Sequence, residues 1–136
     1  MTYAELKAKQ QQESNDFPFM WAFGQQQFDE MLRKNNVTTK DIYSIGAGGY
    51  IRKTDAKAMV EMFNRHKTEL AEARKQSKFL REAIINEMSN HEYCITGDRE
   101  EVLEACGITE ADYQNNEDIR SAWKAAEKTY AASVRA

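Results

Sequence analysis

Apolar residues recur three and four positions apart along most of the chain, which is the spacing of an amphipathic helix. Capping residues, glycine and proline then mark where each helix begins or ends. The pattern predicts helices over about residues 3–15, from Gly24 to Asn36, from Thr54 or Asp55 to about Arg74, from Ser77 onward, from Asp98 to Gly107, and from Asn116 or Glu117 onward. The residues expected on the buried faces of the fourth and last of these helices are Leu80, Ala83, Ile84, Glu87 and Met88, and Ile119, Trp123 and Tyr130.

Two segments depart from helical spacing and favour extended structure. Phe17–Phe23 is aromatic and uncharged around the only proline of the chain, so we predict a buried strand there. Ile42–Ile45 and Tyr50–Arg52 flank the loop Gly46–Gly49, and this order predicts a β-hairpin, because glycine tolerates the positive φ of a tight turn. The whole pattern predicts an α+β fold: a mostly helical single domain over residues 1–136 with a small antiparallel sheet of two or three strands.

Composition narrows the class of protein. The 136 residues include 19 basic and 22 acidic residues, a net charge of −3, which excludes a strongly basic nucleic-acid coat and a disordered acidic tail. The longest apolar run, Phe17–Phe23, is far shorter than the roughly 20 residues of a membrane-spanning helix, and charged residues stand where a signal peptide is apolar. Two cysteines, Cys94 and Cys106, are too few for a disulfide framework. We therefore expect a cytoplasmic protein with reduced thiols and no membrane contact.

Charge is distributed unevenly along the chain. Residues 52–82 hold nine basic and five acidic residues, whereas residues 87–118 hold ten acidic residues and one basic residue, Arg99. An acidic surface of that density can steer toward a basic partner, and it can occupy a nucleic-acid channel if its carboxylates are spaced like phosphates. Helix N-termini also favour acidic residues, so a purely structural role stays open. The candidate partner-binding residues are Asp98, Glu100, Glu101, Glu104, Glu110, Asp112, Glu117 and Asp118.

The glycine loop suggests phosphate binding, because Gly46, Gly48 and Gly49 let backbone N–H groups approach an anion, and Arg52 and Lys53 follow with positive charge. The spacing is not that of a P-loop. A dinucleotide-binding loop leads directly into a helix, whereas an apparent strand follows this loop. A hairpin turn therefore accounts for the glycines without a ligand and leaves both cations solvated, while a ligand-binding loop is the alternative.

Histidine and cysteine offer few candidates for metal binding or nucleophilic catalysis. His91 and Cys94 have the spacing of a half-site, yet His66 and Cys106 stand too far along the chain to complete the two close pairs of a structural zinc site. We expect no zinc and no other cofactor. His91 then ends a helix and Cys94 is a small buried residue, although a Cys94 nucleophile activated by His91 is a second hypothesis.

Four segments carry distinctive motifs, and they are Thr2–Gln11, Phe17–Phe23, Ser44–Asp55 and Asn90–Cys94. In these segments the chain resembles an uncharacterised family of small proteins encoded by bacteria, phages and other mobile elements. No reaction, cofactor or binding residue is established for that family, so the resemblance implies a setting rather than a mechanism. Small phage proteins often bind and block host machinery, and inhibitors of CRISPR nucleases are one class of them.

We predict a non-enzymatic protein-binding module that acts through the acidic residues between positions 87 and 118, as an inhibitor of a host-defence nuclease. The expected partner is a host protein, a nucleic-acid-handling complex, and the negative charge argues against direct binding of DNA or RNA. The alternative hypothesis is a small-molecule or nucleotide-binding protein, or an enzyme, that uses the glycine loop with Arg52, Lys53 and His91. The sequence does not indicate an oligomeric state.

Overall fold

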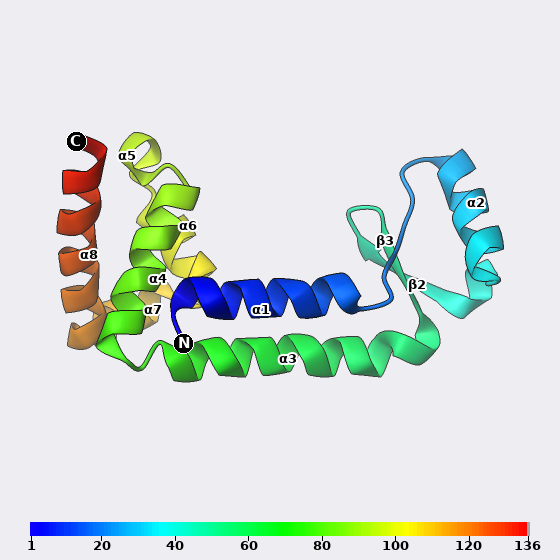
Figure 1. Cartoon of the computed structure of the whole chain (residues 1–136), viewed down its shortest axis with the longest axis horizontal. Helices are drawn as coiled ribbons and strands as arrows, with labels where there is room; N and C mark the ends of the chain where they lie inside the picture. Colours follow the sequence, from blue (N-terminus) through cyan, green and yellow to red (C-terminus); the bar gives the residue numbers. More distant parts are fainter. Residues whose placement is uncertain (136) are drawn as a thin grey trace. The chain divides into compact units, whose positions relative to one another are not determined.

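The computed structural model describes residues 1–135 and confirms the α+β class, in which helices dominate and accompany a small antiparallel sheet (Figure 1). The elements are α1 (Tyr3–Asp16), β1 (Met20–Trp21), α2 (Gln25–Asn35), β2 (Ile42–Gly46), β3 (Gly49–Arg52), α3 (Ala56–Ala73), α4 (Ser77–Asn90), α5 (Tyr93–Thr96), α6 (Arg99–Ala105), α7 (Glu110–Asn115) and α8 (Glu117–Arg135), with short 3-10 turns at Thr39–Asp41 and Lys53–Asp55. Every helix predicted from the sequence is present, and the short α5 and α7 lie outside those predictions. No helix in residues 1–135 has a stretch apolar and long enough to cross a membrane.

The chain divides into two compact units. Unit 1 consists of Met1–Gln10 and of the chain from His66 onward, and unit 2 consists of Gln11–Arg65. The boundaries lie within α1 and α3, so each of these helices contributes residues to both units. The single domain over residues 1–136 stays a prediction.

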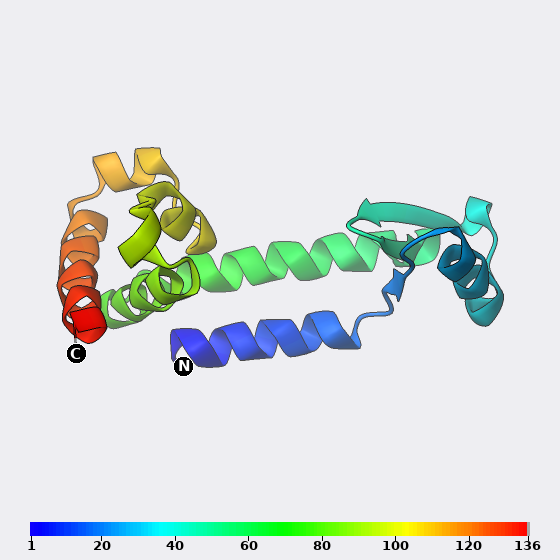
Figure 2. The same cartoon turned by 90° about the horizontal axis from the view of Figure 1, so that it is seen from above.

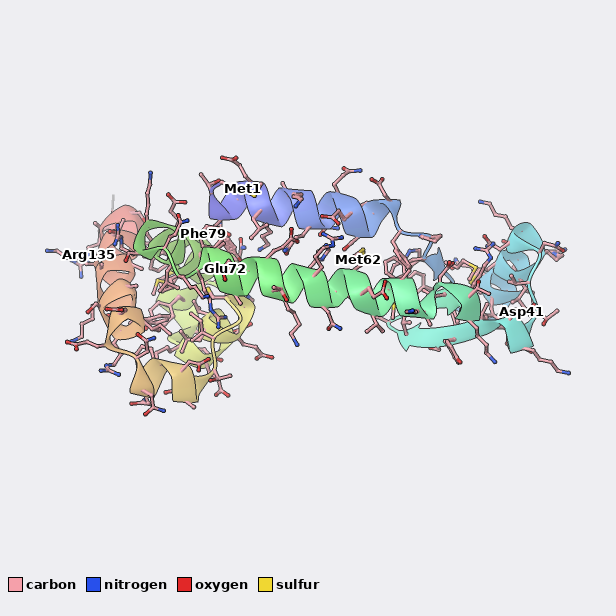
Figure 3. All side chains as sticks on the ribbon, turned by 90° about the horizontal axis from the view of Figure 1, so that it is seen from below. Met1, Asp41, Met62, Glu72, Phe79 and Arg135 are labelled. Atoms are coloured by element: carbon pink, nitrogen blue, oxygen red, sulfur yellow. The ribbon has the colours of Figure 1, made fainter. Side chains whose placement is uncertain are left out.

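The core of unit 1 forms where α4 and α8 pack along each other (Figure 1), with side chains filling the space between them (Figure 3). All five residues predicted on one face of α4 are buried, and Ile84 and Met88 are 0% exposed. Trp123 and Tyr130 of α8 are buried as predicted, whereas Ile119 is half-buried. Further buried members of this core are Tyr3, Leu6, Phe79, Val102, Leu103, Cys106, Ile108, Tyr113, Ala122 and Ala126. Each large apolar side chain enclosed in this way contributes about 1.5–3 kcal/mol to folding.

Capping residues set the ends of the helices in unit 1. Asp98 precedes α6, and its carboxylate accepts a hydrogen bond of 3.2 Å from the Glu101 N–H, as predicted. Gly107 follows α6, where the sequence places the end of the helix, and its φ of 74° is the left-handed conformation in which glycine commonly ends a helix. The prediction that Ser77 caps α4 is wrong, because the extended residue before the helix is Gln76 and Ser77 is already the first helical residue.

Unit 2 holds a three-stranded antiparallel sheet in the order β1-β3-β2, with α2 alongside it (Figure 2). β2 and β3 form the predicted hairpin, in which Tyr43 lies opposite Ile51 and Ser44 opposite Tyr50. The buried residues that join α2 to the sheet are Met20, Ala22, Met31 and Ile42. This cluster has fewer members than the core of unit 1, so unit 2 encloses less apolar surface.

The aromatic segment Phe17–Phe23 corrects the prediction of a buried strand. Only Met20–Trp21 pair with β3, and only alternate side chains are enclosed. Met20 is 5% exposed, whereas Trp21 is 55% and Phe23 is 67% exposed. Successive side chains of an extended segment point to opposite sides. Met20 and Ala22 therefore pack into the buried cluster with α2, whereas Trp21 and Phe23 face solvent.

Candidate functional site

The eight acidic residues predicted to bind a partner are all exposed, and they belong to α6, α7, the start of α8 and the adjoining turns. Several of them have intramolecular partners. Asp98 caps α6, and Asp112 completes a capping box at α7 with Thr109. Glu110 accepts a hydrogen bond of 2.6 Å from Arg99, and this bond holds the pKa of the Glu110 carboxyl below its ordinary value. Part of the acidic segment therefore serves the fold, as the structural interpretation expects.

Glu100 and Glu104 differ from these residues, because their carboxylates have neither an ion pair nor a hydrogen bond within residues 1–135. They stand four positions apart on α6, so both side chains lie on the same side of the helix. They surround a hollow of about 460 Å³, here called the acidic hollow, whose lining residues are Glu100, Glu104, Gly107, Ile108, Thr109 and Glu110. Glu110 is already paired with Arg99, so Glu100 and Glu104 supply the uncompensated negative charge, which favours a cationic group.

The glycine loop of unit 2 is a tight hairpin turn. Ala47 and Gly48 form the turn with φ angles of 52° and 80°, and positive φ at both central residues is the rule for this type of hairpin. A Cβ atom on Gly48 would lie 2.5 Å from the Phe23 ring, and one on Gly49 would lie 3.0 Å from the Trp21 ring. The glycines therefore serve both the turn and the close packing of aromatic residues over it.

The two cations that follow the loop also have local roles. Arg52 is half-buried and donates a hydrogen bond of 3.2 Å to the backbone carbonyl of Asn35 at the end of α2, which corrects the expectation that it is merely solvated. The Lys53 ammonium lies 5.1 Å from the centre of the Tyr43 ring. These contacts favour the hairpin interpretation over a phosphate-binding loop.

His91 and Cys94 do not act on each other in the structure. His91 follows the last residue of α4, as predicted, with its Nδ1 atom 2.9 Å from Glu101 and its Nε2 atom 3.2 Å from Glu87. Cys94 is exposed, so the prediction that it is a buried residue is wrong, because it belongs to the short α5 at the surface of unit 1. Cys106 is the buried cysteine, and burial raises the pKa of its thiol to about 12.

Glu87 is the centre of a buried polar cluster in unit 1. Its carboxylate is 3% exposed and accepts hydrogen bonds from the Tyr3 hydroxyl at 2.7 Å and from the Lys7 ammonium at 2.6 Å. Asn90 donates to the same carboxylate at 3.3 Å. Burial raises the pKa of Glu87, but the hydrogen bonds from Lys7 and Tyr3 outweigh it, so the net shift is downward. The ionised carboxylate thus anchors α1 to α4 within unit 1.

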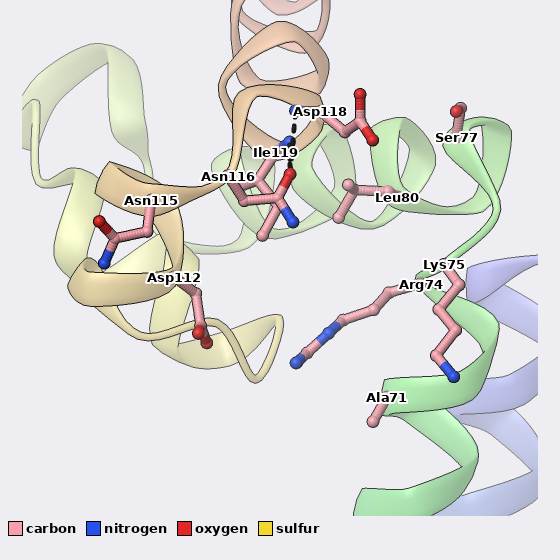
Figure 4. Close-up of a pocket in the computed structure, with 10 residues that line it drawn as sticks. All are labelled: Ala71, Arg74, Lys75, Ser77, Leu80, Asp112, Asn115, Asn116, Asp118 and Ile119. Carbon is pink, nitrogen blue, oxygen red and sulfur yellow. Dashed lines mark hydrogen bonds between the residues drawn. The ribbon is translucent and has the colours of Figure 1, made fainter.

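A pocket of about 550 Å³ lies among α3, α4, α7 and α8 in unit 1 (Figure 4). Its lining residues are Ala71, Arg74, Lys75, Ser77, Leu80, Asp112, Asn115, Asn116, Asp118 and Ile119. Arg74, in the turn that follows α3, extends into the pocket and donates a hydrogen bond to the backbone carbonyl of Gly107. The structure therefore separates the predicted acids, because three of them line the acidic hollow and two others line this second pocket, here called the helix pocket.

The chain matches DUF7659, a family of unknown function, over residues 2–129. The protein belongs to this family. No curated protein and no solved structure matches the chain. The resemblance to an uncharacterised family is thereby confirmed, while an origin in bacteria, phages or mobile elements stays a prediction.

Sequence reasoning missed two features of this DUF7659 member. Glu87 was placed on the apolar face of its helix, and a carboxylate at such a position is itself the signal for a buried polar cluster. The helix pocket had no comparable signal, because its residues come from four helices whose packing the spacing of apolar residues does not specify.

Proposed function

We propose that the protein is a non-enzymatic binding module that captures a basic segment of a partner protein in the acidic hollow of unit 1. The observation that carries the proposal is the pair Glu100 and Glu104, four positions apart on α6 without a cation between them. Like charges at this spacing repel each other, so an incoming lysine or arginine side chain relieves a repulsion that the free protein retains. The third carboxylate of the hollow, Glu110, is already paired with Arg99, and Ile108 and Gly107 supply apolar lining for the stem of a long cationic side chain.

The narrower proposal concerns the partner. A nucleic-acid-handling protein presents lysine and arginine where it holds phosphates, and an acidic hollow is complementary to such a surface. An inhibitor of a host-defence nuclease would act in this way, by occupying a basic surface that otherwise binds nucleic acid. The same charge argues that the protein alone forms no complex with DNA or RNA at physiological salt.

A pair of charge-reversed variants tests the acidic hollow. Glu100→Lys with Glu104→Lys removes both carboxylates and leaves the contact between Glu101 and His91 in place. The control, Asp29→Lys with Glu61→Lys, makes the same change in net charge at two exposed positions of unit 2. Both are assayed by pull-down and by association kinetics against purified host nuclease complexes over a range of salt concentrations.

We expect the hollow variant to associate more slowly and to bind at least about tenfold more weakly, while the control stays close to the unmodified protein. Equal weakening of both variants would show that only the net charge matters. Binding that neither variant changes would place the interaction elsewhere on the protein.

The alternative function, a small-molecule or nucleotide site on the glycine loop, has less support. Aromatic side chains lie close to Gly48 and Gly49, and Arg52 is hydrogen-bonded to the Asn35 carbonyl. The structure does not bring a phosphate-binding helix N-terminus directly after the loop. A thermal-shift screen of nucleotides and metal ions tests it in parallel. A saturable shift that Arg52→Ala abolishes in a folded protein would favour this alternative.

A further inference from the structure

The helix pocket holds opposite charges that are not joined by a direct ion pair among the described residues. Arg74 reaches into it from the turn after α3, and Asp112 and Asp118 line its other side from α7 and α8 (Figure 4). The pKa of the Asp112 carboxyl is lowered by its hydrogen bonds with Thr109 and, to a smaller extent, by the charge of Arg74. Within residues 1–135 Arg74 forms no ion pair with either aspartate, and its hydrogen bond goes to the Gly107 carbonyl. The volume of about 550 Å³ lies within the range of pockets that hold small ligands.

The two aspartates are not equivalent. Asp112 accepts a hydrogen bond from the Thr109 N–H, which occupies one of its oxygens in the capping box of α7. The Asp118 carboxylate has no hydrogen bond within the described residues. The cap of α8 is Asn116, whose side-chain oxygen accepts a hydrogen bond of 2.9 Å from the Asp118 N–H. Asp118 is therefore the carboxylate available to a cationic ligand group.

The remaining lining residues suit a peptide backbone between the two charges. Ser77 and Asn115 have side chains without a hydrogen bond in residues 1–135, and they can donate to and accept from amide groups. Leu80, Ile119 and Ala71 provide apolar surface for a side chain. Because Arg74 and Asp118 do not pair directly, a ligand with a charge at each end can contact both residues.

We propose that the helix pocket binds a short zwitterionic peptide of two or three residues, with its terminal carboxylate at Arg74 and its terminal ammonium group at Asp118. Each peptide residue extends the chain by about 3.3–3.6 Å, so a peptide of two or three residues places its terminal charges further apart than a single amino acid does. A guanidinium binds a carboxylate through two parallel hydrogen bonds, which makes Arg74 the site of the C-terminal end. The helix pocket and the acidic hollow share no lining residue, although Arg74 of the pocket is hydrogen-bonded to Gly107, which lines the hollow.

The experiment uses di- and tripeptides of alanine and leucine as probes, titrated into the full chain by calorimetry. Each peptide is compared with its N-acetylated form, which lacks the ammonium group, and with its C-terminal amide, which lacks the carboxylate. We expect saturable binding of the free peptides and at least about tenfold weaker binding of either capped form. No saturable binding by any free peptide up to about 10 mM would overturn the proposal.

Variants then assign each peptide end to its residue. In Asp118→Asn the contact with the ammonium group is already lost, so the free and N-acetylated peptides are expected to bind equally. In Arg74→Gln the contact with the carboxylate is already lost, so the free peptide and its amide are expected to bind equally. Glu117→Gln is the matched control, since Glu117 precedes Asp118 in α8 and does not line the pocket. Arg74→Gln also removes the hydrogen bond to Gly107. If that variant does not fold, Asp118→Asn alone decides the assignment. Capping effects that persist unchanged in Asp118→Asn would overturn the assignment.

Discussion

Unit 1 and unit 2 differ in where they place their large apolar side chains. In unit 1 the residues at the centre of α4, such as Ile84 and Met88, are 0% exposed. In unit 2 three aromatic residues, Trp21, Phe23 and Tyr43, are 55%, 67% and 51% exposed. A helix with packed neighbours can enclose its apolar face, whereas a two-residue strand and a tight hairpin leave alternate side chains at the surface. An aromatic-rich sequence is therefore not by itself evidence of a core.

The largest expected effect lies in the core of unit 1. Ile84→Ala removes buried atoms and leaves a cavity, so we expect the free energy of unfolding to fall by about 2–5 kcal/mol. In unit 2, Phe23→Ala trims an exposed ring, and we expect a change within about 0.5 kcal/mol. Urea denaturation followed by circular dichroism measures both variants.

Tryptophan fluorescence sharpens the same comparison. The chain has two tryptophans, and Trp21 lies in unit 2 while Trp123 lies in the core of unit 1. In a Trp21→Phe background the fluorescence reports on unit 1 alone. Similar losses of stability for Ile84→Ala and Phe23→Ala would contradict the difference in burial described above.

The second prediction concerns the buried carboxylate of unit 1. Glu87→Gln keeps the shape of the side chain but loses the charge that Lys7 and Tyr3 bind, so we expect a loss of about 1–3 kcal/mol near neutral pH. The pKa of Glu87 is lower in the folded than in the unfolded protein, so its contribution is present above the unfolded pKa of about 4.3 and is lost as the pH falls through the folded pKa. The difference in stability between the two proteins should therefore shrink in acid. A difference that stays constant from pH 7 to about pH 3 would contradict the assigned charge.

The third prediction uses the hairpin turn of unit 2, where two substitutions should have opposite signs. Gly48→Ala places a methyl group against the Phe23 ring at positive φ, and we expect a cost of at least about 1–2 kcal/mol. Ala47→Gly removes a side chain from a residue that already has a φ of 52°, and we expect a gain of up to about 1 kcal/mol. Thermal denaturation of both variants measures the effect, and destabilisation by Ala47→Gly would contradict the turn geometry.

The smallest expected effects separate the two cations after the hairpin. Arg52→Ala removes the hydrogen bond to the Asn35 carbonyl, so we expect a loss of about 1 kcal/mol. Lys53→Ala, at an exposed position, should change stability by less than about 0.5 kcal/mol. Chemical denaturation measures the two side by side. Equal and negligible losses of stability for both variants would contradict a structural role for the Arg52 hydrogen bond and would favour the solvated side chain expected from the sequence.

The sequence by itself determined the features that depend on neighbours within a few positions. The helices other than α5 and α7, the carboxylate cap at Asp98, the left-handed Gly107 and the hairpin around the glycine loop all follow from local rules of spacing and backbone conformation. The acidic character of the segment that contains the hollow was also visible, because charge is a property of composition. The same local rules overstated the strand at Phe17–Phe23, since they do not say which side of an extended segment is covered.

Only the tertiary structure decided which residues meet. Tyr3 and Glu87 are separated by 84 positions, and their hydrogen bond exists because α1 packs beside α4 within unit 1. Arg74 reaches the Gly107 carbonyl across 33 positions, and Asp118 joins the same pocket from another helix. No local spacing encodes such pairs, because they arise from the angles at which helices pack to bury their apolar faces. The packing of the core therefore determines which charged residues, distant in the sequence, lie together on the surface as candidate sites.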